Sequence, residues 1–311
     1  MIAPPPSWHL ALARVDGALP LLSRTETTLL ARRSLRRLWT HHVQSYPFEN
    51  FGPDHEPGLD AAELVRCHYA AERDAFCSWI ARRAAPPLAE AASSVLTAKG
   101  VPETFSPAYT DADAALDRLD ALLPSEDPGG ALVDLVGQLR DQETSFLEGG
   151  SETYIAAGHA FNRPPQRGSA WAASLAVAMR PQLFALGAAP LALAGLLSRE
   201  VFQFRRERSV PAILAEALLD AATAARTDII GGRYAVELAK GRLAKIRRSS
   251  RACDVWLLLA GLGPLTRAEI ARALHVTKRT ASQAAATLEG VGLVSATGRH
   301  EGLRVAAPLE T

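Results

Sequence analysis

The stretch TRAEIARALHVTKRTASQ, which runs from Thr266 to Gln283, decides the fold of the C-terminal part of the chain. Thr266 and Glu269 stand at the spacing of a capping box, in which the threonine oxygen accepts from a free amide and the glutamate reaches back. Thr277 offers a second N-cap after a short helix with one apolar face. The spacing predicts two short helices joined by a tight turn at His275, which is helix-turn-helix spacing.

The second of these helices is expected from Lys278 to Glu289 and has two unlike faces. Ala281, Ala285 and Leu288 fall on one face and are expected to be buried. The opposite face is polar, basic and flat, and it suits the major groove of duplex DNA, where Lys or Arg donates to guanine and Gln pairs with adenine. The residues expected to contact DNA on and beside this face are Thr277, Lys278, Arg279, Ser282 and Gln283.

A β-hairpin is expected after this helix. The strands Leu293 to Thr297 and Leu303 to Ala306 flank the glycine-bounded tip Gly298 to Gly302. Arg299 and His300 lie in the tip and are predicted to contact the DNA backbone or the minor groove.

These features, from the buried helix at Cys253 to Ala260 to the hairpin, resemble the MarR-like winged-helix regulators. The resemblance rests on LHVTKRTASQ, which starts at Leu274, on Leu288, and on Gly292-Leu293-Val294. It covers about a fifth of the chain and implies a DNA-binding winged helix-turn-helix over residues 250 to 308. His275 departs from the family, which commonly has glycine in the turn. Histidine tolerates the left-handed conformation better than most residues but less easily than glycine.

Charge is distributed unevenly along the chain. Lys240 to Thr311 holds twelve Lys and Arg against five Asp and Glu, a charge of +7, whereas the preceding residues carry −6. Such asymmetry suggests that one end meets a polyanion. Arg247, Arg248 and Arg251 precede the DNA-binding region and are predicted to neutralise phosphates; a solvated linker is the alternative.

The sequence predicts a mostly α protein, with a multi-helix N-terminal body and a C-terminal winged helix-turn-helix bearing a small β-hairpin wing. Strand-like alternation is nearly absent before residue 290. We expect a buried helix in the apolar run Leu183 to Leu197, and a break at Gly231-Gly232 before a basic helix from Tyr234 to Arg248. The predicted domains are 1–110, a helical N-terminal region; 111–232, a helical core; 233–251, a basic connector; and 252–311, the winged helix. This layout also resembles a family of alphaproteobacterial helical proteins with a terminal winged helix, a resemblance that implies no chemistry for the body.

Motifs for nucleotide, dinucleotide, zinc-protease and hydrolase chemistry are absent from the sequence, so we predict neither an enzyme nor a cofactor. Glu63, Cys67, His68 and Glu72 are spaced so that a metal or acid-base cluster can be drawn on one helix. Nothing local completes a set of three or four convergent ligands, so we predict no metal site.

Function follows from the C-terminal region. We expect a bacterial transcriptional regulator that binds double-stranded DNA as a homodimer and responds to an unknown small-molecule or protein effector. A docking or chromosome-maintenance module, and a helical enzyme fused to a DNA-targeting domain, stay open as alternatives. Three cysteines without CxxC spacing and without a preceding leader predict a cytoplasmic protein. The longest uncharged apolar run, at fifteen residues, is too short for a membrane span.

Overall fold

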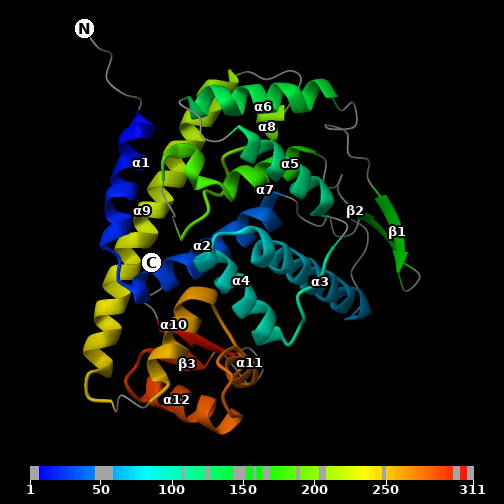
Figure 1. The fold of residues 1–311 in the computed structure, drawn as a ribbon. Helices are drawn as coiled ribbons and strands as arrows, with labels where there is room; N and C mark the ends of the chain where they lie inside the picture. The colour runs from blue at the N-terminus through cyan, green and yellow to red at the C-terminus, as the bar shows by residue number, and fades with distance from the viewer. Residues whose placement is uncertain are drawn as a thin grey trace.

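The structure is a computed structural model. It describes residues 7–45, 59–106, 109–122, 127–142, 152–156, 159–163, 169–186, 190–202, 208–246, 250–296 and 302–306. The described part of the chain is mostly helical, as predicted (Figure 1).

The helices of the N-terminal body surround one helix, α2. The body elements are α1 (Ser7–Ala18), η1 (Leu19–Leu21), α2 (Arg24–Ser45), α3 (Leu59–Arg83), α4 (Pro86–Lys99), α5 (Thr110–Ala121), α6 (Pro128–Gln142), β1 (Glu152–Ala156), β2 (His159–Arg163), α7 (Ser169–Ala178), η4 (Pro181–Phe184), α8 (Arg199–Phe202) and α9 (Val210–Leu243). The C-terminal unit, residues 250–306, contains α10 (Ala252–Leu262), α11 (Arg267–Ala273), α12 (Lys278–Gly290), β3 (Val294–Ala296) and β4 (Leu303–Val305).

Three consecutive residues of α2 point into three clusters of buried apolar side chains. Leu30 belongs to a cluster with α1, α6 and α9; Ala31 belongs to a cluster with α3, α4, α5 and α7; and Leu29 joins the core of the C-terminal unit. All three are at most 3 % exposed. Because α2 packs against α4, α9 and α10, it connects the body to the C-terminal unit (Figure 1).

The C-terminal unit has a small core, to which a few residues of the body also contribute. Trp256 and Leu258 of α10 are buried, together with Ala285 and Leu288 of α12. The strands β3 and β4 pair antiparallel. Ala98 of α4 completes this core from the body side.

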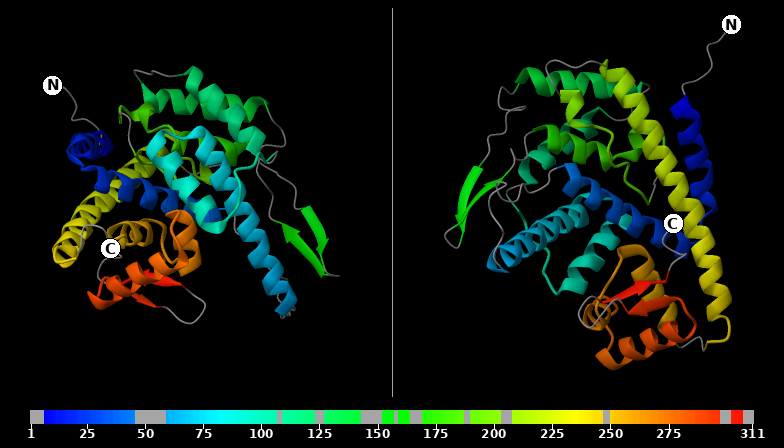
Figure 2. Two further views of the ribbon diagram at one scale, coloured as in Figure 1. Left: turned by 60° about the horizontal axis from the view of Figure 1, so that its bottom comes forward. Right: turned by 180° about the vertical axis from the view of Figure 1, so that it is seen from behind.

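The expected break at Gly231-Gly232 is wrong. Helix α9 continues through both glycines from Val210 to Leu243 and lies alongside α1, as Figure 2 shows from behind. Gly232 is buried there, and a Cβ at this position would meet only Leu29 at an ordinary 3.8 Å. Packing against α2 therefore outweighs the low helix propensity of glycine.

Two further expectations need correction. Most described residues of the run 183–197 are buried as predicted, but apart from the single turn η4 they are irregular rather than helical. Pro181 lies just before this run and Pro190 lies within it, and because each lacks a backbone donor, they account for the interruption. Strands also occur before residue 290, because β1 and β2 form an antiparallel hairpin.

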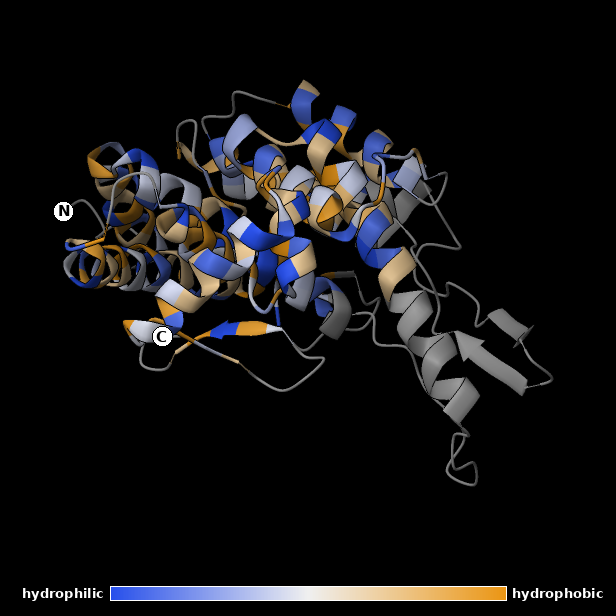
Figure 3. Cartoon of the chain, turned by 90° about the horizontal axis from the view of Figure 1, so that it is seen from below, coloured by the Kyte–Doolittle hydropathy of each residue, from blue (hydrophilic) through white to orange (hydrophobic). Residues whose placement is uncertain are grey.

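Hydrophilic and hydrophobic residues alternate in bands along the described helices (Figure 3). This pattern is typical of helices with one buried face. Within the described ranges, no helix combines the length and the apolar character that crossing a bilayer requires.

Candidate nucleic-acid interface

Helix α11 begins where the sequence predicts. The side chain of Thr266 accepts a hydrogen bond from the amide of Glu269 at 3.3 Å, and the Glu269 carboxylate accepts from the amide of Thr266 at 2.8 Å. The capping box is therefore confirmed. It satisfies two amides that have no partner within a helix of seven residues.

Glu269 also connects α11 to the body, because Lys99 at the end of α4 donates to its carboxylate. Burial alone would raise the pKa of Glu269, but the hydrogen bonds from Lys99 and Thr266 outweigh it and hold the pKa below 4.5. A carboxyl group whose pKa is lowered on folding stabilises the protein at pH values above its ordinary pKa. This stability is lost as the pH falls through the folded-state pKa. A second bond fixes α11 to α4, because Arg272 Nε donates to the carbonyl of Ala98 at 2.8 Å.

The turn between α11 and α12 has one unusual residue. His275 has a φ of 49°, in the left-handed region. We expected this conformation because winged-helix regulators commonly have glycine at this position of the turn. Its amide donates to the carbonyl of Arg272, and the next amide, of Val276, donates to Ala271. Thr277 then caps α12, since its Oγ1 accepts from the amide of Thr280 at 3.1 Å.

Helix α12 divides into the two predicted faces. Ala281, Ala284, Ala285 and Leu288 are buried. Lys278, Arg279 and Gln283 are exposed, and no described residue forms a hydrogen bond or ion pair with their side chains. Ser282 is half-buried at the edge of this face. The outer surface of α12 therefore combines two cations and an amide that are free to meet a ligand.

The turn after α12 is fixed by the body. Arg242, at the end of α9, donates from Nη1 to the carbonyls of Val291 and Gly292 at 3.2 and 2.7 Å. Gly292 has a φ of 67°, which favours glycine. On the neighbouring side, Arg267 of α11 pairs with Glu289 of α12 at 3.1 Å. These contacts fix the angle between α12 and the strands that follow it.

The remaining sequence-based candidates have different outcomes. Arg251 is exposed but forms an ion pair with Asp254 at 3.0 Å, so its charge is partly neutralised. Arg299 and His300, at the expected hairpin tip, and Arg247 and Arg248 lie outside the described residues. The sequence reasoning did not select Arg304, which is exposed on β4 between buried Leu303 and Val305. The alternation of apolar and charged residues in that strand is the sequence signal that could have identified Arg304 as exposed.

Of the metal or acid-base cluster drawn from the sequence, Glu72 is the residue whose side chain the structure describes, and its partners are His42 and Tyr109. His42 Nε2 lies 3.2 Å from Glu72 Oε1, and the Tyr109 hydroxyl donates to the same oxygen at 2.8 Å. All three residues are less than 10 % exposed, and burial raises the pKa of Tyr109 well above 10. These three side chains join α2 and α3 to the start of α5. The side chains of Glu63, Cys67 and His68 lie outside the described residues.

Among the described residues, no group of three or more His, Cys, Asp or Glu side chains is arranged to hold a metal ion. Comparison with known proteins adds no assignment: no protein-family model matches the chain, and neither a curated protein nor a solved structure shows significant similarity to it.

Proposed function

We propose that the protein binds duplex DNA through a C-terminal winged helix-turn-helix and acts as a transcriptional regulator. In this proposal α12 enters the major groove, while β3, β4 and the connection between them form the wing. The observation that carries the proposal is the outer face of α12, where Lys278, Arg279 and Gln283 are exposed, without partners among the described residues, and on a helix fixed at both ends.

The chemistry of this face fits base recognition. The major groove is about 12 Å wide and accepts an α-helix, and Arg or Lys donates there to guanine, whereas Gln pairs with adenine. The two cations lie in the first turn of α12, the part of a recognition helix that contacts base edges. The surplus of seven positive charges between Lys240 and Thr311 supplies the attraction to phosphate.

The first test uses the intact protein and a library of randomised duplexes. Successive rounds of selection are expected to enrich a sequence motif. The affinity for the enriched duplex, measured by fluorescence anisotropy, should fall as salt concentration rises, because binding releases counterions from phosphates. If no duplex binds in a salt-dependent manner, the proposal is wrong.

The second test asks whether α12 is the reading helix. Arg279→Ala is expected to weaken binding to the enriched duplex by about 1 to 3 kcal/mol, and Gln283→Ala should relax base preference at one position. Arg14→Ala is a matched control, because Arg14 is exposed and lies on α1, a helix of the body. Equal effects of Arg279→Ala and Arg14→Ala would contradict the role of α12 and favour a protein-docking module.

The homodimer belongs to the same proposal. A symmetric dimer would place two copies of α12 about one helical turn apart on the duplex, so the enriched motif should be an inverted repeat. Light scattering of the complex measures whether two chains bind each duplex.

A further inference from the structure

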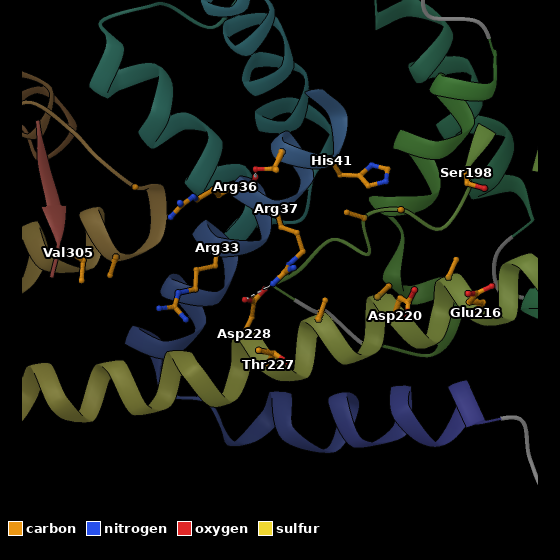
Figure 4. A pocket seen from close by; sticks show the side chains of 18 of the residues that line it. Arg33, Arg36, Arg37, His41, Ser198, Glu216, Asp220, Thr227, Asp228 and Val305 are labelled. Atoms are coloured by element: carbon orange, nitrogen blue, oxygen red, sulfur yellow. Dashed lines mark hydrogen bonds and ion pairs between the residues drawn. The ribbon is translucent and has the colours of Figure 1, made fainter. Parts of the chain in front are cut away.

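A cleft of about 700 Å³ lies between α2 and α9. Figure 4 shows the side chains that line it, with the arginines of α2 on one wall and the acidic residues of α9 on the other. The C-terminal unit closes one end, where Gly263, Pro264, Arg304 and Val305 contribute to the lining. Its volume is within the range of pockets that bind small molecules.

The wall formed by α2 is strongly cationic. Arg33, Arg36 and Arg37 stand at i, i+3 and i+4, so they share one face of the helix and line the cleft together. Burial lowers the pKa of Arg33, attraction to Asp228 opposes this effect, and repulsion from Arg36 and Arg37 lowers the pKa further. Like charges at this spacing destabilise a helix, so the arrangement carries an unfavourable interaction that a bound anion would relieve.

The acidic residues opposite neutralise only part of this charge. Asp228 accepts a bidentate pair of hydrogen bonds from Arg37, at 3.0 and 2.8 Å. Arg36 has no hydrogen bond or ion pair from its guanidinium to any described residue. It lies beside Gly263 of the C-terminal unit, where a Cβ would be 3.7 Å from Arg36 Cζ. The end of the cleft nearest the C-terminal unit therefore presents a cation that is free to bind.

The rest of the cleft is different in character. Arg208 is held by Glu200 and Glu216, so this cation is already neutralised by its own carboxylates. Between the two ends, the small apolar residues Ala217, Ala221 and Ala224 of α9 line the cleft, and Asp220 of the same helix faces it among them. The cleft thus combines a cationic end with a middle of small apolar residues and one carboxylate.

We propose that this cleft binds a small organic anion, with its charged group on Arg36 and Arg33 and its apolar body against α9. Such a ligand contacts the body and the C-terminal unit at once. The inference extends the proposed function, because a ligand that bridges the two parts would act as the effector of a DNA-binding protein. Binding to the cleft itself does not depend on DNA.

The probe for the test is 1-anilinonaphthalene-8-sulfonate, an organic anion with an apolar body whose fluorescence rises when it is removed from water. We expect the intact protein to bind one molecule of dye, and we expect octanoate to displace it. Arg36→Met should weaken dye binding by about tenfold or more, because a hydrogen bond to a charged group is lost, and Arg36→Lys should restore part of the affinity.

Arg14→Met serves as the control, since it removes an exposed arginine outside the cleft. Ala224→Phe fills the cleft without changing its charge and should abolish binding, with circular dichroism confirming that the variant is folded. The proposal is refuted if the dye does not bind, or if Arg36→Met and Ala224→Phe both bind it as the unchanged protein does.

Hydrogen exchange tests whether the ligand bridges the two parts. With dye bound, amide exchange should slow in α2 and also at the end of α10 and in β4. Slowing confined to the body would refute the bridging position. Because neither measurement contains DNA, a failure here is distinct from a failure of the proposed DNA binding.

Discussion

His275 occupies the turn between α11 and α12 with a φ of 49°, a conformation that disfavours residues with a Cβ. Residues branched at Cβ are the least tolerant of it, so His275→Val should lower the free energy of unfolding by about 1 to 2 kcal/mol. His275→Gly removes the strain but gives the unfolded chain more freedom, so its stability should be unchanged or up to about 1 kcal/mol higher. Urea denaturation measures both variants. A valine variant as stable as the glycine variant would contradict the strained turn.

At the same scale, the parts of the candidate site that depend on local sequence were predictable. The caps at Thr266 and Thr277 involve residues three positions apart, so the sequence alone specifies them. The cleft beside α2 was not predictable. Arg33 and Arg36 mark a charged helix face in the sequence, but which elements cover that face depends on contacts with α9 and α10, which are distant in the chain.

Helix α9 shows how packing overrides a local signal at the scale of an element. Gly232 suggested a break, yet it lies inside a continuous helix, where a Cβ would meet Leu29 at 3.8 Å. Alanine fits this position, and it loses less conformational freedom than glycine on entering a helix. Gly232→Ala should therefore raise the free energy of unfolding by roughly 0.5 to 1 kcal/mol. Thermal unfolding followed by circular dichroism measures this change. A destabilised variant would mean that α9 bends or opens at this glycine.

The segment 183–197 is a second case at this scale. Its leucines were correctly expected to be buried, and Leu186, Leu193 and Leu196 are at most 1 % exposed. Hydropathy reports burial but does not distinguish a helix from an irregular segment that packs in the same core. The prolines indicated that this segment is not a continuous helix, and they are a better guide to its backbone than its apolar composition.

At the scale of the whole molecule, the body and the C-terminal unit share one buried cluster, and Gly261 is a point of close approach between them. A Cβ on Gly261 would overlap Arg32 Cβ and lie 2.8 Å from Arg32 Cδ, near the root of the side chain, where little adjustment is possible. Gly261→Ala is therefore expected to lower the free energy of unfolding by about 1 to 3 kcal/mol, opposite in sign to the matched change Gly232→Ala.

The shared cluster also predicts which parts of the molecule become less stable in the Gly261→Ala variant. Leu29 and Ala98 of the body belong to the same buried cluster as Trp256, so the protein should unfold in one cooperative transition. Hydrogen exchange in low concentrations of urea should therefore give α10 and α2 the same opening free energy, and Gly261→Ala should lower both values equally. If the variant lowers the value for α10 alone, the C-terminal unit unfolds separately. A ligand in the cleft could then influence it only through direct contact, because the two parts would not share a common folding equilibrium.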